Sequence, residues 1–178
     1  MARVFSAIDI EDEDVLKEIE NVQETVDLGF SKTPSSKLHI TLQFFEDINQ
    51  SQIKKIKKTL KNIETEPFEA EIRGVGAFPS EEYIRVVWAG VKSHEIFKLQ
   101  KQSKVHDVAS DNRHEFKPHA TFLRVDDITR KRKKRLQRNI KEFRDHSFGK
   151  IKVDKVKLFE SRVTGKGSEY SVLSEIDL

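Results

Sequence analysis

The chain has 178 residues, of which 36% are hydrophobic and 35% are charged, so it can bury a core beneath a highly charged surface. This length excludes two large independent domains and suits one compact unit, either one domain or two small lobes. Lys and Arg outnumber Asp and Glu by 33 to 30, an excess that alone does not indicate nucleic-acid binding. Cysteine is absent, which excludes disulfides and thiolate metal sites. The sequence shows no membrane-span pattern and no signal-peptide pattern, so we expect a cytoplasmic protein.

The first half of the chain predicts a strand, a helix, a strand, a helix and a strand. These elements cover residues 3–10, about 13–27, 37–45, from Asn49 or Ser51 to about 63, and 68–78, with a turn at Pro79. Residues alternate in polarity along KLHITLQFF (37–45), and the predicted buried face of this strand consists of Leu38, Ile40, Leu42 and Phe44. His39 and Thr41 then share its opposite face.

The second half repeats this order and adds one strand. The predicted elements are strands over 83–91, 117–125 and 151–159, helices over about 94–109 and 129–143, and a final strand over 169–178. The basic run TRKRKKRLQR (129–138) belongs to the second helix, whose apolar spacing assigns these charges to a solvated face. We expect it to steer an anionic substrate rather than to make specific contacts. TGKGS (164–168) lacks the spacing of a phosphate-binding loop and indicates a hairpin turn, so ATP chemistry has no support.

The two halves superimpose without a gap at a shift of 80 residues, since 119 − 39 = 80. Lys37, His39 and Thr41 then fall on the Lys, His and Thr of KPHATFLRV (117–125), and the apolar skeletons coincide. We therefore predict an α+β fold of two lobes related by a pseudo-twofold axis, each a small, mostly antiparallel sheet backed by helices. The spacing allows the two motifs to meet at a central cleft but does not require it. The single domain spans 1–178, with repeats of roughly 1–80 and 81–160 and an extra C-terminal strand.

Two histidines and two threonines suit the cleavage of a phosphodiester. That reaction needs a base for the nucleophile, an acid for the leaving oxygen, and donors for the charged phosphoryl oxygens. His39 and His119 can supply the first two, and the hydroxyls of Thr41 and Thr121 the third. A single His on a strand is more often a structural residue, but the repeat favours chemistry because most other polar positions differ between the halves.

Other readings of the polar residues are weaker. The remaining histidines have no counterpart in the repeat and indicate ordinary surface or helix positions: His94, His106, His114 and His146. Zinc is disfavoured because Cys and a His-Glu-x-x-His pattern are both absent, so we expect no metal and no cofactor.

Strict alternation from His119 sends Arg124 to the other face of the strand, so a role at the site requires a bend or strand end. Four aromatic residues can stack on a base or ribose: Phe5, Phe45, Trp88 and Tyr170. Aromatic residues on strands, however, more often belong to the core.

The assembled motifs resemble one family almost from end to end. The segments that carry the resemblance are RVFSAIDI, LHITLQFFED, GAFPS, RVVWAGV, FKPHATFLRV and KVKLFESRVTGKGSEYSVL. They are similar to the two-histidine phosphoesterase superfamily, specifically its LigT branch, the RNA 2′,3′-cyclic phosphodiesterases also called 2′-5′ RNA ligases. One departure is Gln43, which stands where the family often has an arginine, and it puts substrate contacts on that side in doubt.

The resemblance implies a metal- and ATP-independent hydrolysis of RNA 2′,3′-cyclic phosphate ends to 2′-phosphates. By this analogy His39 is the proton donor to O3′ and His119 the proton acceptor from water, while Thr41, Thr121 and Arg124 bind the phosphate. The family names also imply a reverse reaction that joins such an end to a 5′-hydroxyl. The implied partner is RNA with a cyclic phosphate end, for example a tRNA fragment, with no membrane and no obligate protein partner. A monomer is expected because the repeat supplies both halves of the site.

Two alternatives remain open from the sequence. One is a phosphodiesterase for a small molecule, such as a cyclic nucleotide or a 2′-5′ oligonucleotide. The other is an RNA-binding protein without turnover, although binding alone gives no reason for paired His and Thr.

Overall fold

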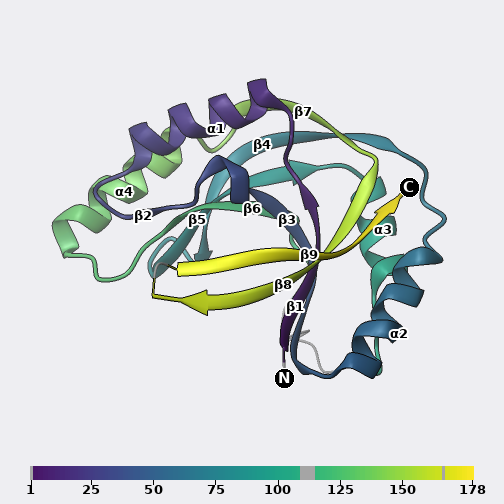
Figure 1. The fold of residues 1–178 in the computed structure, drawn as a ribbon. Helices are drawn as coiled ribbons and strands as arrows, with labels where there is room; N and C mark the ends of the chain where they lie inside the picture. Colours follow the sequence, from purple (N-terminus) through teal and green to yellow (C-terminus); the bar gives the residue numbers. More distant parts are fainter. Residues whose placement is uncertain (1, 109–114, 166) are drawn as a thin grey trace.

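The computed structural model describes residues 2–108, 115–165 and 167–178 (Figure 1). In chain order its elements are β1 (Ala2–Asp9), α1 (Glu13–Val26), β2 (Ser31–Lys32), the 3-10 helix η1 (Ser35–Lys37), β3 (His39–Ile48), α2 (Gln50–Lys61) and β4 (Phe68–Pro79). They continue with β5 (Ile84–Lys92), α3 (Glu95–Ser103), β6 (His119–Arg124), α4 (Arg130–Glu142), β7 (Ser147–Val153), β8 (Lys155–Thr164) and β9 (Gly167–Asp177). None of the helices described is both long and apolar enough to cross a membrane.

Local sequence signals explain where the helices start. The side chain of Asn49 accepts a hydrogen bond from the backbone N–H of Gln52 at 3.0 Å, and the Gln52 side chain accepts from the Asn49 N–H at 2.9 Å. This capping box starts α2 and identifies Asn49, rather than Ser51, as its N-cap. Thr129 is a simple N-cap of α4, since its hydroxyl accepts a hydrogen bond of 3.4 Å from the backbone N–H of Arg132. The helix expected over 94–109 is shorter, because α3 ends at Ser103; residue 109 lies outside the described residues.

The strands form one sheet in which their order differs from their order in the sequence, and the two motif strands, β3 and β6, lie in its middle. The order is β7-β4-β5-β6-β3-β1-β8-β9, with β2 added beside β6, and all pairings between the described strands are antiparallel. β3 and β6 meet through one registered pair, Ile40 and Ala120, which are themselves 120 − 40 = 80 residues apart. The pseudo-twofold axis therefore passes between these residues, and the α+β class predicted from the sequence is confirmed.

The strand exchange between the halves differs from the prediction. β4 belongs to the first repeat but pairs with β5 and β7, while β8 from the end of the second repeat pairs with β1. The cause is local for β4, since the short connection to β5 makes the two an antiparallel hairpin. The lobes therefore do not coincide with residues 1–80 and 81–160.

The single strand predicted over 151–159 is also wrong. The chain passes Asp154 and changes partners there, so that β7 lies at one edge of the sheet and β8 lies beside β1. Asp154 and Lys155 are both half-buried and interrupt the alternation of buried and exposed residues. The segment predicted as one strand therefore covers the end of β7 and the beginning of β8, which have different neighbours in the sheet.

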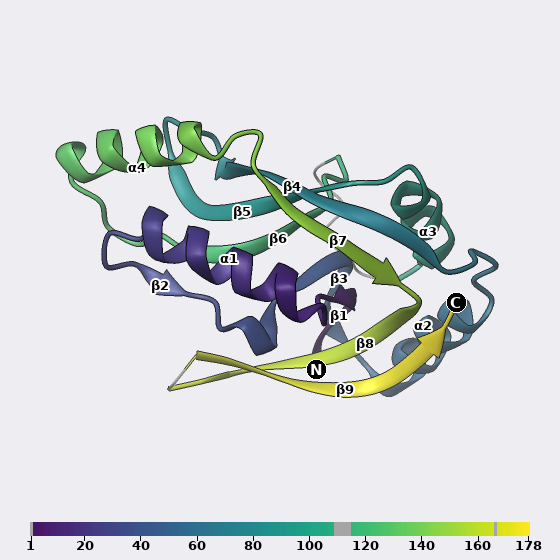
Figure 2. The same ribbon diagram turned by 90° about the horizontal axis from the view of Figure 1, so that it is seen from above.

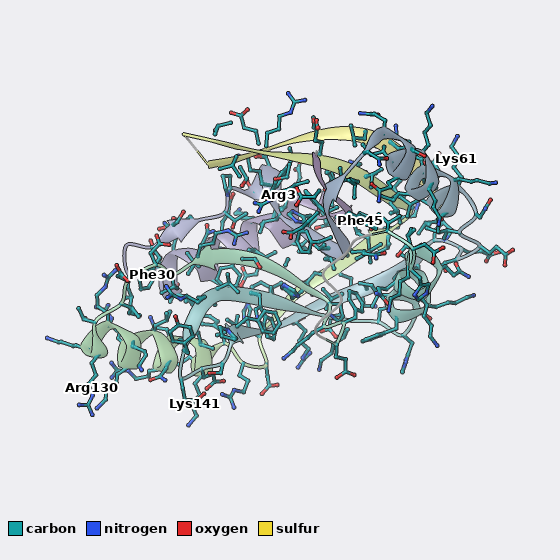
Figure 3. The ribbon with its side chains drawn as sticks, turned by 90° about the horizontal axis from the view of Figure 1, so that it is seen from below. Arg3, Phe30, Phe45, Lys61, Arg130 and Lys141 are labelled. Atoms are coloured by element: carbon teal, nitrogen blue, oxygen red, sulfur yellow. The ribbon has the colours of Figure 1, made fainter. Side chains whose placement is uncertain are left out.

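The helices pair at opposite ends of the sheet. α1 contacts α4 and β7 at one end, and α2 contacts α3 at the other, as Figures 1 and 2 show from two directions. Seen from below, Lys61 on α2 and Arg130 on α4 lie far apart at these two ends (Figure 3). Each helix pair thus mixes one helix from each repeat.

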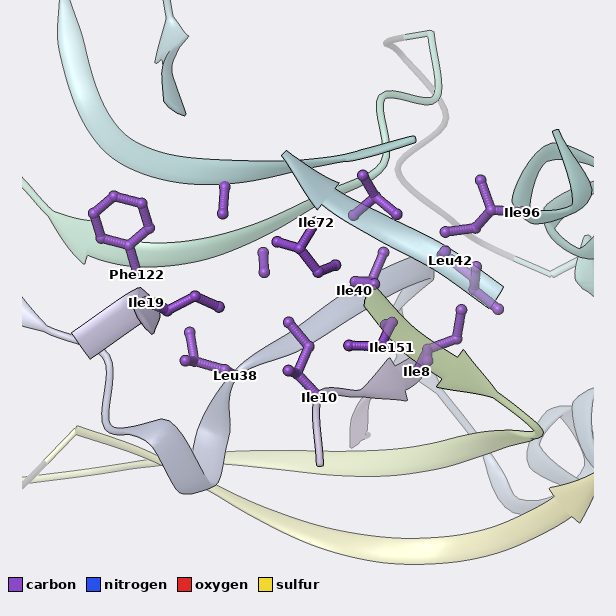
Figure 4. Packing of buried hydrophobic residues seen from close by; sticks show 14 of the residues in the cluster. Ile8, Ile10, Ile19, Leu38, Ile40, Leu42, Ile72, Ile96, Phe122 and Ile151 are labelled. Atoms are coloured by element: carbon purple, nitrogen blue, oxygen red, sulfur yellow. The ribbon is translucent and has the colours of Figure 1, made fainter. Parts of the chain in front are cut away.

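One large hydrophobic core runs through both lobes, beside a small separate cluster of Phe5, Ala7 and Phe159. The large core includes Ile19 of α1, Ile40 of β3, Ile72 of β4, Phe122 of β6 and Ile151 of β7, each no more than 2% exposed (Figure 4). Because residues from both repeats interdigitate in one cluster, neither lobe has a core of its own. The central strands that carry the histidines are consequently held from both sides.

Candidate active site

The structure brings the two His-x-Thr motifs to one cleft. His39 and Thr41 of β3 and His119 and Thr121 of β6 all line a cavity of about 360 Å³. The rest of its lining comes from the segment around β2, from β3 and β6, and from the β8–β9 hairpin: Ser31, Lys32, Thr33, Pro34, Lys37, Phe44, Arg124, Gly167, Ser168 and Tyr170. The volume lies at the lower end of the range for small-molecule sites and suits a single nucleotide.

A β-bulge in each motif strand decides which later residues reach the cleft. Thr41 pairs with Ala7 while Gln43 pairs with Ser6, so Leu42 is the extra residue in β3. The pairings of β6 with β5 leave out Phe122 in the same way, and 122 − 42 = 80. A bulge shifts the alternation of side chains by one residue. Both strands therefore keep His and Thr on the cleft face and also turn the residue three positions after Thr toward it.

The bulge corrects the assignment of the two phenylalanines. Phe44, expected in the core, is 51% exposed and lines the cleft, whereas Phe45 is 1% exposed and packs in the core. The predicted base or ribose contact of Phe45 is therefore wrong. Arg124 lines the cleft at the position equivalent to Phe44, and the bulge supplies the irregularity that this placement requires. Gln43 is 4% exposed and exchanges two hydrogen bonds with the backbone of Val105, so its role is structural.

Both histidines are held in the same tautomer. His39 Nδ1 lies 2.8 Å from the carbonyl oxygen of Lys37, and His119 Nδ1 lies 2.6 Å from that of Lys117. A carbonyl oxygen can only accept a hydrogen bond, so Nδ1 carries the proton in each ring and donates it. In both residues Nε2 is left as the atom that can take up or release a proton in catalysis.

Aromatic side chains support each imidazole. Phe5 and Tyr170 lie 4.9 and 5.5 Å from His39, measured between ring centroids. Phe78 and Trp88 lie 4.8 and 6.0 Å from His119. Phe5 is 2% exposed, so it packs behind His39 and the predicted stacking of Phe5 on a base is wrong. Trp88 is likewise buried, at 8% exposure, whereas the half-buried Tyr170 lines the cleft, and its contact with a base or ribose stays a prediction.

The charged surroundings of the two imidazoles differ. Burial lowers the pKa of His39, and the nearby Asp9 carboxylate opposes this shift while Arg124 and His119 reinforce it. Burial also lowers the pKa of His119, and the Lys117 ammonium lowers that pKa further. The Lys117 Nζ lies 4.5 Å from the ring centroid of Trp88, a cation–π contact that holds the charge beside His119.

The sheet register shows why the pseudosymmetry breaks at this point. Asp9 of β1 pairs with His39, and the equivalent partner of His119 on β5 is Gly90. A Cβ atom on Gly90 would lie 2.7 Å from the carbonyl oxygen of Arg73, so no side chain fits there. A carboxylate therefore stands beside one imidazole and cannot stand beside the other.

The β8–β9 hairpin and β2 contribute residues that sequence reasoning missed. Lys37 Nζ donates a hydrogen bond of 2.9 Å to the carbonyl oxygen of Ser168, which ties this hairpin to the first motif. The presence of a lysine at the same position in both motifs, Lys37 and Lys117, was the only signal in the sequence that pointed to a role for Lys37. The two-residue strand β2 left no such signal, because Ser31 and Lys32 are placed only by pairing with β6.

The other histidines that the structure describes do not line this cleft. His146 Nε2 lies 2.7 Å from Glu18 Oε1, His94 precedes α3, and His106 is exposed. His114 and Lys166 of the TGKGS turn lie outside the described residues. Over 2–108, 115–165 and 167–178, no group of three or more His, Cys, Asp or Glu side chains is arranged to hold a metal ion.

Several known proteins are similar to this chain in sequence or in fold. The family described as the AKAP7 2′5′ RNA ligase-like domain matches residues 4–178. The chain is 30% identical over 176 residues to the RNA 2′,3′-cyclic phosphodiesterase of Methanocaldococcus jannaschii, covering 97% of this chain and 99% of that protein. It is 33% identical over 177 residues to the protein of the same name from Methanothermobacter thermautotrophicus, covering 95% of each. E. coli LigT complexed with 3′-AMP has the same fold, with a TM-score of 0.79 at 19% identity over 99% of this chain and 98% of LigT. The chain therefore belongs to the AKAP7 2′5′ RNA ligase-like family.

Proposed function

We propose that this protein hydrolyses RNA 2′,3′-cyclic phosphate ends to 2′-phosphates. The observation that carries the proposal is the meeting of His39, Thr41, His119 and Thr121, from two repeats, at one cleft. Relatives that carry the name RNA 2′,3′-cyclic phosphodiesterase match nearly the whole chain, which supports the same conclusion.

In the proposed reaction the two imidazoles move protons in opposite directions. His119 Nε2 takes a proton from a water molecule as its oxygen attacks phosphorus. The bond between phosphorus and O3′ breaks, and His39 Nε2 gives its proton to O3′, which leaves a 3′-hydroxyl and a 2′-phosphate. One proton is taken up and one is released, so exchange with solvent restores both histidines without ATP. The two imidazoles supply both proton transfers, and no step is assigned to a metal.

The surroundings of the imidazoles support these roles. Asp9 stabilises a positive charge on His39, as the proton donor requires, and Lys117 disfavours one on His119, as the proton acceptor requires. The pairing of Asp9 with His39, and of Gly90 with His119, provides the geometric basis for the difference.

The other cleft residues suit the remaining parts of the substrate. Thr41 and Thr121 each offer a hydroxyl donor for the non-bridging oxygens, and Arg124 offers a guanidinium for the phosphate charge. Phe44 and Tyr170 offer aromatic surface for the terminal base or ribose. We assign base contact to Phe44 in place of Phe45.

The cellular setting and the reverse reaction are part of the same proposal. We expect residues 1–178 to act as one monomeric catalytic domain in the cytoplasm, without an obligate protein partner. RNA with a cyclic phosphate end, tRNA fragments included, is the expected substrate. Attack by a 5′-hydroxyl in place of water would give the reverse 2′-5′ ligation with the same two imidazoles.

Turnover in EDTA is the direct test. Purified protein is incubated with an oligonucleotide that ends in a 2′,3′-cyclic phosphate, and phosphorus NMR follows the appearance of the 2′-phosphate. His39→Ala and His119→Ala should each abolish turnover, whereas His94→Ala, outside the cleft, should leave it unchanged. Turnover that survives both motif substitutions would contradict the mechanism. Tight binding without any product would indicate the non-catalytic RNA-binding alternative.

A small-molecule phosphodiesterase is the second candidate, favoured by the small volume of the cleft, about 360 Å³. Comparing kcat/KM for 2′,3′-cyclic AMP with that for an RNA end separates it from the first. Equal values would support the small-molecule substrate.

A further inference from the structure

The outer face of α4 is strongly basic, and the only carboxylate of the helix is Glu142 in its last turn. Its exposed cations, called the α4 basic face below, are Arg130, Lys131, Lys134, Arg135, Arg138 and Lys141. Throughout the part of the chain that the structure describes, no carboxylate forms an ion pair with any of these six side chains. The six cations therefore form a patch of positive charge, and the carboxylates of Glu82, Asp126 and Asp127, which line one cavity with Arg130 and Lys134, are not ion-paired with it.

This arrangement is unfavourable for the helix itself. Arg130 and Lys134, Lys131 and Arg135, and Lys134 and Arg138 are like charges four residues apart, which destabilises a helix. Arg130 and Lys131 also place positive charge in the first turn, where the helix dipole disfavours it, and no acidic residue stands in that turn. Because the chain contains 30 acidic residues that could have balanced this surface, an anionic partner is the simplest explanation.

The α4 basic face adjoins the edge of the cleft. Arg132 of α4 donates a hydrogen bond to the carbonyl oxygen of Leu28, and its guanidinium lies 4.6 Å from the ring centroid of Phe30. That segment continues directly into β2, whose Ser31 pairs with Arg124 and lines the cleft. Figure 3 shows Phe30 beside the end of α4 that carries Arg130. A chain leaving the cleft past β2 would thus meet α4.

The repeat provides an internal comparison. Four exposed lysines on α2 are equivalent to four cations of the α4 basic face at the shift of 80 residues: Lys54, Lys55, Lys58 and Lys61. On α2, however, Lys55 forms an ion pair of 2.8 Å with Asp107. Gln50 and Ser51 stand where α4 has Arg130 and Lys131. The basic charge is therefore greater on α4, and among the described residues none of its six exposed cations forms an ion pair.

We propose that the α4 basic face binds the phosphate backbone of the RNA nucleotides on the 5′ side of the reacting end. This inference rests on the proposed function, because a 2′,3′-cyclic phosphate is a 3′ terminus and the rest of the RNA lies 5′ to it. The helix has 13 residues, so it is about 20 Å long and can follow several nucleotides. Lys and Arg side chains on a helix surface contact phosphates rather than base edges, so binding is independent of sequence and sensitive to salt.

The test uses two matched variants, each without four exposed cations. The α4 variant carries Lys134→Gln, Arg135→Gln, Arg138→Gln and Lys141→Gln. The α2 variant carries Lys54→Gln, Lys55→Gln, Lys58→Gln and Lys61→Gln. The net charge changes equally, and glutamine is a good helix former, so both should fold; circular dichroism and thermal melting check this. Substrates are 2′,3′-cyclic AMP and a single-stranded 20-nucleotide RNA with a cyclic phosphate end.

The α4 variant should lose at least tenfold in kcat/KM for the 20-nucleotide RNA and less than twofold for cyclic AMP. The slope of log kcat/KM against log salt for that RNA should become shallower by up to about 3, since each phosphate contact to a single strand contributes about 0.7. The α2 variant should change less than twofold with both substrates. Equal losses in the two variants, or no loss in the α4 variant, would overturn the inference.

A separate measurement distinguishes failure of the inference from failure of the proposed function. Fluorescence anisotropy with a 20-nucleotide RNA that ends in a 2′-phosphate reports binding without turnover. Tighter binding by wild type than by the α4 variant would support the inference even if neither substrate were hydrolysed. Equal binding would overturn it and would point to an acidic protein as the partner of α4.

Discussion

The adjacent residues Phe44 and Phe45 provide the sharpest test of the bulge that shapes this cleft. Simple alternation along β3 buries Phe44 and turns Phe45 toward the cleft, whereas the bulge at Leu42 reverses both assignments. Replacing each phenylalanine by alanine separates the two arrangements, because the same change is made one residue apart on one strand.

The magnitudes follow from burial. Phe45 is 1% exposed, and truncating a buried phenylalanine to alanine costs about 3–5 kcal/mol. Phe44 is 51% exposed, so Phe44→Ala should change the free energy of unfolding by about 0.5 kcal/mol or less. For a chain of 178 residues, a loss of about 4 kcal/mol lowers Tm by about 8–16 °C.

Chemical and thermal unfolding measure these differences, with the fluorescence of Trp88, the single tryptophan, as the probe. Steady-state kinetics with 2′,3′-cyclic AMP supply the complementary readout. Phe44→Ala should raise KM while stability is retained, because the aromatic surface facing the base is lost. A larger loss of stability for Phe44→Ala than for Phe45→Ala would refute the bulge and, with it, the placement of Arg124 in the cleft.

Three further predictions concern charge at the site. Lys117→Met removes a positive charge that lowers the His119 pKa, so this pKa should rise and the acidic limb of the kcat/KM pH profile should move to higher pH; an unmoved limb would exclude His119 as the base. Asp9→Asn removes a negative charge that raises the His39 pKa, so the alkaline limb, where the acid loses its proton, should move to lower pH; movement of the acidic limb alone would instead reverse the two roles. Arg124→Lys keeps the charge but not the planar pair of donors, so kcat/KM should fall about 10- to 100-fold while both limbs stay in place, and full activity would remove Arg124 from phosphate binding.

The strand exchange makes the two repeats dependent on each other. β4 of the first repeat completes the lobe that carries His119, and β8, from the end of the second, completes the lobe that carries His39. Each motif strand also pairs with strands from both halves of the chain: β3 pairs with β1 and β6, and β6 pairs with β5, β3 and β2. The pseudosymmetry places the two imidazoles at equivalent positions. Their charged surroundings differ because Asp9 pairs with His39 and Gly90 pairs with His119.

The sequence by itself was enough to predict the α+β class and most strands and helices, and its repeat allowed the convergence of the two motifs without requiring it. These features depend on local periodicity and on one repeat, and a pattern of alternating residues is visible without knowledge of neighbours. Only the tertiary structure decided which residues beyond the motifs face the cleft. The bulges at Leu42 and Phe122 arise from pairing with β1 and β5, and a one-residue shift exchanges the faces of all later residues. It also decided that Asp9 reaches one histidine, and that α4 lies beside the cleft edge, because both depend on contacts between segments distant in the chain.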